Sequence, residues 1–316
     1  MKPSLGLVLL GAFLLGLLPG RGQPEDLPIR VLLREVPLGQ EVALKLPQGE
    51  VRARGTPQGV VVEGKALPLW DFPVPYFALE GRAYRGGVRL LVEGSRLLVV
   101  NQVLLEDYLL GVLPGEMPEG FPLEALKAQA VVARTFAVNR LNPKAPYDLC
   151  ATEVCQVYLG LSAEKERHRL AVAATRGQVL SYGGRAISAL YHADSGGMTA
   201  GSEEVFGRAL PYLRPRPDPY AKGPKSLWRM PLEKAQAARV LQALGLSPLG
   251  EDPPQVLERS PSGRVWRVRL LGVELRGLEA GRALRLMGLP STLVEFAGFE
   301  AIGLSLIHIS EPTRQA

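Results

Sequence analysis

Residues 105–140 read LEDYLLGVLPGEMPEGFPLEALKAQAVVARTFAVNR and carry the strongest helical pattern of the chain. Apolar residues recur in it at spacings of three and four, which places them on one helix face: Leu123, Leu126, Ala130, Ala133 and Ala137. Pro122 suits the first turn of this helix, and Asn142-Pro143 marks its end. We therefore predict a long helix from Pro122 to about Leu141, preceded by a short helix that breaks at Pro114.

The flanking segments predict a mixed fold. Residues 24–100 are β-branched or Leu-rich runs broken by Pro and Gly, which is typical of short strands, with a hairpin turn at 93–95. Further helices are expected over 163–177 and 231–245, and further hairpins around Gly183-Gly184 and over 255–272. Because strands and helices do not alternate regularly, we predict an α+β fold.

Composition excludes several classes of protein. The 316 residues are 47% hydrophobic and 22% charged, with 2 Cys, which excludes a disordered chain, a coiled coil and a disulfide-stapled miniprotein. The formal net charge is +6 and falls to +4 without Lys2 and Arg21 of the expected signal segment; this mildly basic balance suits an anionic envelope polymer but produces only a weak field. No RNP, helix-turn-helix or zinc-finger pattern is present, so we expect no nucleic-acid partner.

The first residues resemble a secretory signal peptide. Lys2 precedes an apolar run from Leu5 to Leu18, and small residues follow at Gly20 and Gly22. We expect cleavage near Gly22, with an uncleaved anchor as the alternative. No later segment reaches 18 apolar residues, so we expect an exported protein without a membrane span after cleavage.

The last residues, LSLIHISEPTRQA at 304–316, resemble the translation of a sequencing-library transposon adapter. We expect the natural sequence to continue differently after about Gly303. The alternative is a genuine polar tail.

Glu116, in LPGEMPEG, is the first candidate for chemistry. It lies between Pro and Gly residues ahead of the long helix, with Leu113, Met117 and Phe121 as apolar neighbours that would suit a general acid. From spacing alone, a solvated loop carboxylate is the simpler interpretation. A two-carboxylate hydrolase would pair Glu116 with Glu106 or Glu119.

Cys150 and Cys155 form a C-x4-C pair that leaves three interpretations open. In an exported protein they predict a local disulfide, and as thiolates they would bind zinc with a third ligand from His192 or Glu153. Free thiols are the third interpretation. Ser195, in DSGG, lacks the G-x-S-x-G context of a nucleophile elbow, which disfavours a serine hydrolase.

Taken together, three segments resemble the SpoIID/LytB family in consistent order from about Val99 to Trp228. They are residues 105–140 quoted above, YDLCATEVCQVYLG at 147–160 and AVAATRGQVLSYGGRAISALYHADSGGMTAGSEEVFGRALPYLRPRPDPY at 171–220. A weaker continuation runs from RVWRVRLLG to LRLMGLPSTLVEF. We therefore expect a signal over 1–22, a β-rich region over 24–98 and an artefactual tail over 304–316. The resemblance adds a family domain over 99–303 that is truncated at its C-terminus.

The resemblance implies an exported peptidoglycan lytic transglycosylase. Such enzymes cleave MurNAc-GlcNAc bonds of peptide-stripped glycan strands and leave 1,6-anhydro-MurNAc ends. Their catalytic acid is the Glu of a G/S-E-M-P motif, here Glu116, and no cofactor is required, although zinc occurs in some relatives. The alternative is a non-catalytic module that binds glycan or activates a cell-wall amidase.

The resemblance also implies substrate-binding roles. They fall on residues of the segments K-A-Q-A-x-x-A-R-T, C-Q-V-Y and Y-H-x-S-S-G-G: Lys127, Arg134, Gln156, Tyr158, His192, Ser195, Gly196 and Gly197. For Arg134, a buried strut is the structural alternative. Val154 stands where some relatives place a zinc-binding His, which weakens the metal interpretation of Cys150 and Cys155. The family's final G-H-G-V-G-M-S-Q-like motif is not found.

Overall fold

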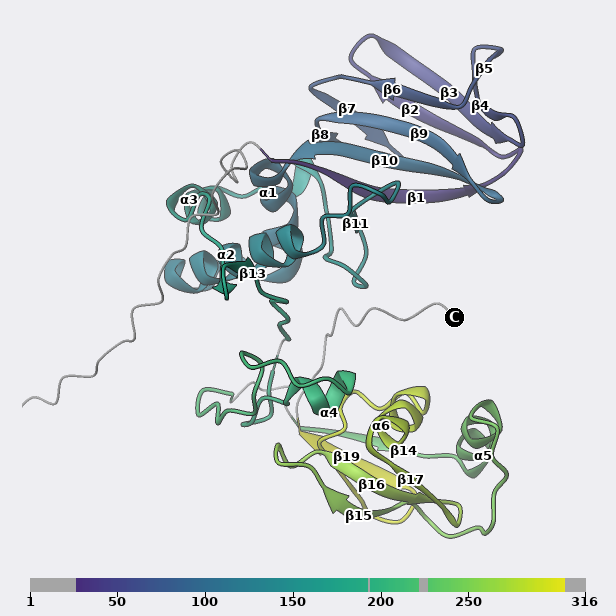
Figure 1. The fold of residues 1–316 in the computed structure, drawn as a ribbon, viewed down its shortest axis with the longest axis vertical. Helices are drawn as coiled ribbons and strands as arrows, with labels where there is room; N and C mark the ends of the chain where they lie inside the picture. The colour runs from purple at the N-terminus through teal and green to yellow at the C-terminus, as the bar shows by residue number, and fades with distance from the viewer. Residues whose placement is uncertain (1–26, 193, 222–226, 305–316) are drawn as a thin grey trace, which may run out of the picture. The chain divides into compact units, whose positions relative to one another are not determined.

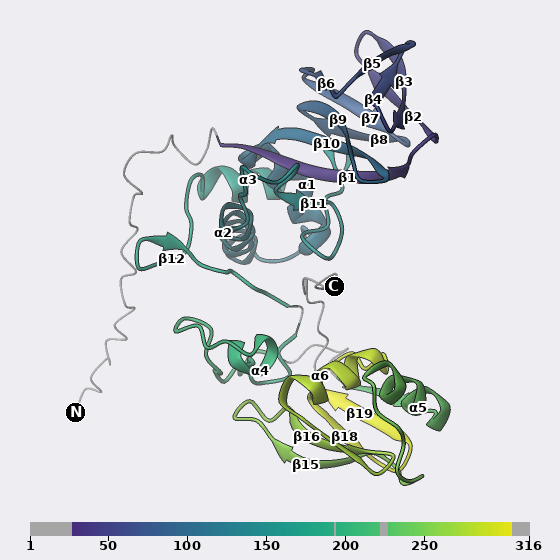
Figure 2. The same ribbon diagram turned by 45° about the vertical axis from the view of Figure 1, so that its right-hand side comes forward.

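A computed structural model describes residues 27–192, 194–221 and 227–304. The chain divides into two compact units, one up to Leu190 and one from Tyr191 onward, and each is described by itself (Figures 1 and 2). The expected signal segment and residues 305–316 of the expected tail lie outside the described residues. Leu304, the first residue of that tail, ends the last strand of the second unit.

The first unit opens with two antiparallel sheets that face each other (Figure 1). One sheet has the order β11-β1-β10-β9-β6, with strands β1 (Pro28–Pro37), β6 (Leu69–Phe72), β9 (Gly87–Glu93), β10 (Arg96–Leu104) and β11 (Leu149–Cys150). The other has the order β5-β4-β3-β2-β7-β8, with β2 (Glu41–Leu46), β3 (Gly49–Thr56), β4 (Gly59–Val62), β5 (Lys65–Leu67), β7 (Tyr76–Leu79) and β8 (Arg82–Arg85). The short strand β11 is the exception to the antiparallel pattern, because it pairs in parallel with β1.

Alternation of side chains explains why these runs form sheets with one buried face. In β2, Val42, Leu44 and Leu46 point into the core while the residues between them face solvent. The hairpin of β9 and β10 turns at Gly94-Ser95, as the sequence predicts. The predicted short strands of residues 24–100 are therefore confirmed.

Three helices follow the sheets: α1 (Leu105–Glu116), α2 (Leu123–Asn139) and α3 (Glu166–Ala174). A 3-10 turn, η2 (Leu161–Ala163), precedes α3, and the two-residue strands β12 (Ser181–Tyr182) and β13 (Arg185–Ala186) follow it. The predicted face of α2 is correct, since Leu126, Ala130, Ala133 and Ala137 are fully buried. Buried residues of the helices and of both sheets form one hydrophobic core. Strand β10 also continues directly into α1. The unit boundary accordingly lies after Leu190, inside the range 99–303 expected as one domain.

Pro114 does not break α1, contrary to the prediction from the sequence. The helix continues to Glu116, and the N–H of Met117 still donates to the carbonyl of Leu113. A proline removes the one N–H that would bond to the residue four positions earlier, and close to a helix end few further turns have to follow it. Glu116 is therefore the last residue of a helix and not a member of a loop.

A buried ion pair joins the three helices. Arg134 of α2 is completely buried, and its Nε and Nη2 donate to the two carboxylate oxygens of Glu106 in α1, at 2.7 and 2.8 Å. The same guanidinium donates to the carbonyl of Val172 in α3 and to that of Gln178 beyond it, at 3.4 and 3.1 Å. One side chain thus ties α1, α2 and the end of α3 together.

The described residues of the second unit form two three-stranded sheets and three helices (Figure 2). The sheets have the orders β14-β19-β18 and β15-β16-β17, with β14 (Leu227–Pro231), β15 (Gln255–Arg259), β16 (Val265–Leu270), β17 (Val273–Arg276), β18 (Val294–Phe296) and β19 (Glu300–Leu304). The helices are α4 (Ser202–Phe206), α5 (Lys234–Ala243) and α6 (Gly277–Leu286). Helix α5 and the hairpin β15-β16 agree with the sequence predictions, and the α+β class is confirmed.

The predicted hairpin around Gly183-Gly184 is much shorter than expected. Its strands β12 and β13 contain two residues each, and Ile187–His192 continue without strand pairing. None of the helices in the described part of the chain combines the length and apolar character that crossing a bilayer requires.

Replacing Arg134 tests the importance of the buried ion pair. Arg134→Met leaves the Glu106 carboxylate buried without its partner, which should lower the free energy of unfolding by about 3–5 kcal/mol in urea denaturation. The double variant Arg134→Met/Glu106→Gln should recover part of this loss, because no uncompensated charge remains. Lys127→Met is the matched control, since its pair with the mostly exposed Glu124 should contribute at most about 1 kcal/mol. Equal losses for both single variants would contradict the assigned role.

Candidate functional site

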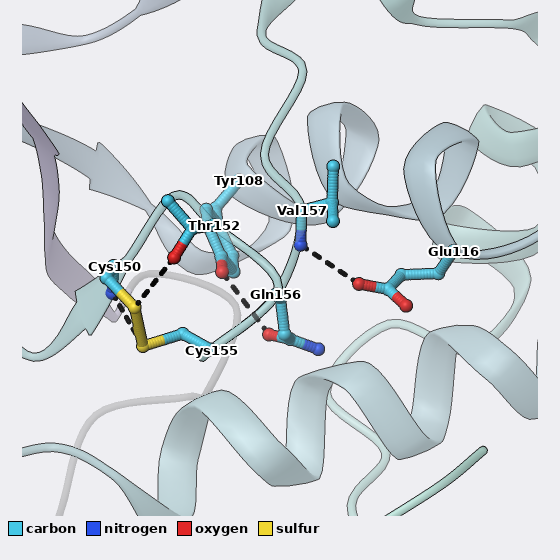
Figure 3. Close-up of a disulfide and its surroundings, with 7 residues drawn as sticks. All are labelled: Tyr108, Glu116, Cys150, Thr152, Cys155, Gln156 and Val157. Carbon is cyan, nitrogen blue, oxygen red and sulfur yellow. Dashed lines mark hydrogen bonds between the residues drawn. A yellow bond between two sulfur atoms is a disulfide. The ribbon is translucent and has the colours of Figure 1, made fainter. Parts of the chain in front are cut away.

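Glu116 is half-buried at the C-terminal end of α1. Its Oε1 accepts a hydrogen bond from the backbone N–H of Val157 at 3.0 Å (Figure 3). Because an N–H can only donate, Oε1 acts as the acceptor at this contact. In a protonated carboxyl group the carbonyl oxygen is the stronger acceptor, so this contact favours the hydrogen on Oε2. The Val157 contact thus distinguishes the two carboxyl oxygens of Glu116.

Two glycines of α1 bring Val157 to Glu116. A Cβ on Gly111 would lie 2.5 Å from the ring of Tyr158, and one on Gly115 would lie 2.9 Å from the carbonyl oxygen of Val157. The two glycines are four residues apart, so they lie on the same helix face. The N–H of Leu159 also donates to the carbonyl of Gly111 at 2.9 Å. Residues 157–159 therefore run in direct contact with the backbone of α1.

A disulfide between Cys150 and Cys155 closes the loop before this segment (Figure 3). The N–H of Cys150 donates to Sγ of Cys155, and the N–H of Tyr158 donates to the carbonyl of Ala151 at 3.1 Å. Of the three interpretations left open by the sequence, the structure has the disulfide. In this oxidised form neither sulfur is a thiolate.

The residues around the two sulfurs do not fit a zinc site. Zinc in proteins is held by three or four ligands, and thiolates are its sulfur donors. Among the described residues no group of three or more His, Cys, Asp or Glu side chains is arranged to hold a metal ion. Zinc binding by Cys150 and Cys155 therefore stays an untested expectation from the sequence.

Gln156 and Tyr158, expected to bind substrate, are both buried. The hydroxyl of Tyr108 donates to Oε1 of Gln156 at 3.3 Å, and the hydroxyl of Tyr158 donates to Oδ1 of Asn101 at 3.1 Å. The ring of Tyr158 packs between those of Tyr84 and Tyr108, and burial raises the pKa of its hydroxyl above the ordinary range. Only 1% of Tyr158 is exposed, so its ring offers no face to a sugar in this structure. The two side chains support the segment that carries Val157.

Lys127 and Arg134, predicted on one stripe of α2, have different environments. Lys127 is partly exposed, and its Nζ pairs with Glu124 at 2.7 Å. Arg134 is enclosed and bonded to Glu106, which is the strut interpretation of this residue. Contact of Lys127 with substrate stays a prediction. For Arg134 the described partners are protein groups, so its part in the site is to hold α1.

The acidic neighbours of Glu116 also differ from each other. Glu106 is buried in its ion pair with Arg134 and accepts a further bond from the N–H of Gly177 at 3.4 Å. This arrangement removes Glu106 from the pair that a two-carboxylate hydrolase would need. Glu119 is exposed on the loop that follows α1, so it is the remaining candidate for such a pair.

His192, Ser195, Gly196 and Gly197 belong to the second unit, which is described separately from Glu116. Ser195 is buried, and its hydroxyl donates to Oδ2 of Asp218 at 2.7 Å while accepting from the N–H of Gly197 at 3.2 Å. These bonds form a compact turn in which the serine has a structural partner. Substrate binding by the four residues stays a prediction.

Arg264, the residue directly before β16, holds this turn in place. It was not identified from the sequence. Its guanidinium is buried and donates to the carbonyls of Ser195 and Met198, at 3.3 and 3.0 Å. Although part of the His192 side chain reaches solvent, desolvation lowers the pKa of its imidazole. The positive charge of Arg264 lowers that pKa further, while Asp218 and Asp194 act in the opposite direction.

Sequence reasoning also missed the backbone elements that hold Glu116. The N–H of Val157 has no sequence signal, because every residue except proline has such a group. The spacing of Gly111 and Gly115 was a readable signal, since two glycines one turn apart in a helix permit a close backbone approach.

Enlarging Gly115 tests whether close packing holds Val157 on Glu116. Gly115→Ala places a methyl group against the Val157 backbone, so one of the two segments must shift. We expect hydrogen–deuterium exchange of the Val157 amide to become at least about tenfold faster, a change that corresponds to about 1.4 kcal/mol. Gly120→Ala is the matched control, because nothing lies within 4 Å of its added Cβ. Unchanged exchange in Gly115→Ala would contradict the packing argument.

Comparison with known proteins gives a family for the region that contains Glu116. Residues 93–182 match the family model SpoIID, described as Stage II sporulation protein. This range includes α1, α2, the disulfide and the Val157 contact, but it ends before the second unit.

Curated relatives extend the match. The chain is 31% identical over 205 residues to Stage II sporulation protein D of Bacillus amyloliquefaciens, covering 59% of this chain and 59% of that protein. It is 40% identical over 126 residues to the Amidase enhancer of Bacillus subtilis, covering 40% of this chain and 17% of the relative. An uncharacterised protein of Brachyspira hyodysenteriae is 39% identical over 158 residues, which cover 49% of this chain and 42% of that protein. The matched regions thus span between 17% and 59% of these relatives. On these matches residues 93–182 are assigned to the SpoIID family.

Proposed function

We propose that this protein is a peptidoglycan lytic transglycosylase that uses Glu116 as its single acid and base. One observation carries the proposal: a half-buried Glu at a helix end, its carboxylate held by a backbone N–H, lies within the region that matches the family. A cell-wall role agrees with the names of the relatives, Stage II sporulation protein D and Amidase enhancer. The proposed substrate is the MurNAc-GlcNAc bond of peptide-stripped glycan strands.

The proposed reaction needs one carboxyl group in two protonation states. Glu116 first donates the proton on Oε2 to the glycosidic oxygen, and the bond from that oxygen to C1 of MurNAc breaks. The C6 hydroxyl of the same sugar then attacks C1, and the ionised Glu116 accepts the hydroxyl proton. The product carries a 1,6-anhydro ring, and no water is consumed. Glu116 ends the cycle protonated, so it is ready for the next bond.

The position of Glu106 favours this route over two-carboxylate hydrolysis. A hydrolase places its second carboxylate across the scissile bond, where it activates water or attacks the sugar. Glu106 instead makes a buried ion pair with Arg134, so its carboxylate is bound to a protein group and does not face a substrate. Intramolecular capture by the C6 hydroxyl removes the need for such a partner.

A second candidate function is a non-catalytic module that activates a cell-wall amidase. It is favoured by the 40% identity to the Amidase enhancer of Bacillus subtilis. In that case the same fold would bind glycan or the amidase, and Glu116 would not act as an acid. Export, which both functions require, rests on the apolar pattern of residues 5–18.

Glu116→Gln is the decisive variant for the enzyme. The amide keeps the shape of the side chain and its carbonyl still accepts from Val157, but it cannot deliver a proton. We expect the wild-type chain to release anhydro-MurNAc ends from purified peptide-free glycan strands. We expect Glu116→Gln to lower that rate at least about 100-fold. Products are identified by mass spectrometry.

Glu119→Gln is the matched control, because this exposed residue lies three positions after Glu116, on the loop that follows α1. Anhydro ends from Glu119→Gln at the wild-type rate support the single-carboxylate mechanism. Reducing ends in place of anhydro ends would indicate a hydrolase. Glycan binding without cleavage by the wild-type chain would favour the amidase-activating module.

A further inference from the structure

A histidine of α3 contacts the residue directly after Glu116. His168 is 1% exposed, and its Nε2 lies 2.9 Å from the carbonyl oxygen of Met117. A carbonyl oxygen can only accept, so Nε2 carries the hydrogen at this contact. The imidazole thus holds the backbone at the point where α1 ends and the Glu116 side chain departs.

The other ring nitrogen of His168 makes a histidine energetically unfavourable at this buried position. Nδ1 of His168 is buried, and among the described residues it has no hydrogen-bond partner. Buried polar atoms without partners are uncommon, because each loses its hydrogen bonds to water. A purely structural contact to one carbonyl would not need this second polar atom in the core. The unpaired Nδ1 lowers the stability of the fold, whereas Nε2 makes the contact with the Met117 carbonyl.

A neighbouring side chain holds the other end of the same loop. Arg167 Nη2 donates to the carbonyl oxygen of Phe121 at 2.9 Å. The loop between α1 and α2, residues 117–122, is thus bonded near both ends by consecutive residues of α3. Residues 118–121 are themselves exposed, so the loop has little packing of its own to fix its path.

Helix α3 is a firm support for these two contacts. Its residues Ala171 and Val172 are buried in the core of the first unit, and the carbonyl of Val172 accepts from the enclosed Arg134. The N-terminal side of α3 is fixed by Arg169, whose guanidinium pairs with the buried Glu164 at 3.0 Å. Movement of the loop relative to α3 would therefore have to break the His168 and Arg167 bonds.

We propose that His168 is a positioning residue for Glu116, and that Arg167 assists it from the outer end of the loop. His168 holds the Met117 carbonyl, and this fixes the end of α1 and with it the direction of the Glu116 carboxyl. Neither His168 nor Arg167 takes a proton from substrate or touches it. The inference rests on the proposed function, because it assigns His168 a part in the reaction of Glu116. Displacement of a catalytic group by about 1 Å can lower a rate by about 100-fold.

The kinetic test compares three variants of α3 in the full chain. His168→Leu keeps an apolar side chain in the core but removes the donor to Met117, so kcat should fall about 10- to 100-fold with KM within about twofold. His168→Gln restores an N–H donor and should recover at least half of the wild-type kcat. Leu170→Ala is the control, because this exposed residue of α3 should leave both constants unchanged. A loss of stability common to all core changes would not produce this split between kcat and KM or the rescue by Gln.

A second measurement does not depend on activity. Hydrogen–deuterium exchange of the fragment covering residues 116–121 should be faster in His168→Leu than in wild type, and close to wild type in His168→Gln. A wild-type chain that cleaves nothing would overturn the proposed function, while the exchange data would still show whether His168 holds the loop. Unchanged exchange in His168→Leu would overturn the positioning role. An effect confined to KM would also overturn it, because it would indicate contact with substrate.

Discussion

The geometry around Glu116 depends on the buried ion pair between Arg134 and Glu106. The pair joins α1 to α2, and the further bonds of Arg134 to Val172 and Gln178 bring in α3 and the chain beyond it. A charge pair without water is stable only when each polar atom has a partner, and here the guanidinium and the carboxylate both bond to backbone as well as to each other. The three helices are therefore held in one arrangement. Glu116, at the far end of α1, inherits its position from that arrangement.

Close packing of two backbone segments brings a hydrogen-bond donor to Glu116. Gly111 and Gly115 let residues 157–159 lie against α1, so that the backbone N–H of Val157 meets the Glu116 carboxylate. The disulfide between Cys150 and Cys155 shortens the loop that leads into this segment. The backbone packing of residues 157–159 on α1 therefore determines which group contacts the Glu116 carboxylate.

The sequence predicted those parts of the fold that are set by local patterns. The face of α2, the strands before residue 100 and the hairpin β9-β10 follow from side-chain periodicity and turn residues. Pro114 misled the prediction, because a proline near the end of a helix removes one bond without ending it. Arg134 and Lys127 share a stripe of α2, yet one is enclosed and the other reaches solvent. That difference arises from where α3 packs, and Tyr158 likewise depends on Tyr84, 74 residues earlier in the chain. Contacts of this kind are not encoded in spacing along one helix.

The use of Glu106 as a structural charge limits the chemistry that the first unit can perform. A carboxylate that is enclosed in the core as the partner of Arg134 cannot also activate water at a glycosidic bond. Glu119 is exposed on the loop after α1. The proposed anhydro-forming route needs a single carboxyl group that first gives and then takes one proton. In the reaction that we propose, Glu116 is that group, and the Val157 N–H holds one of its oxygens in place as an acceptor.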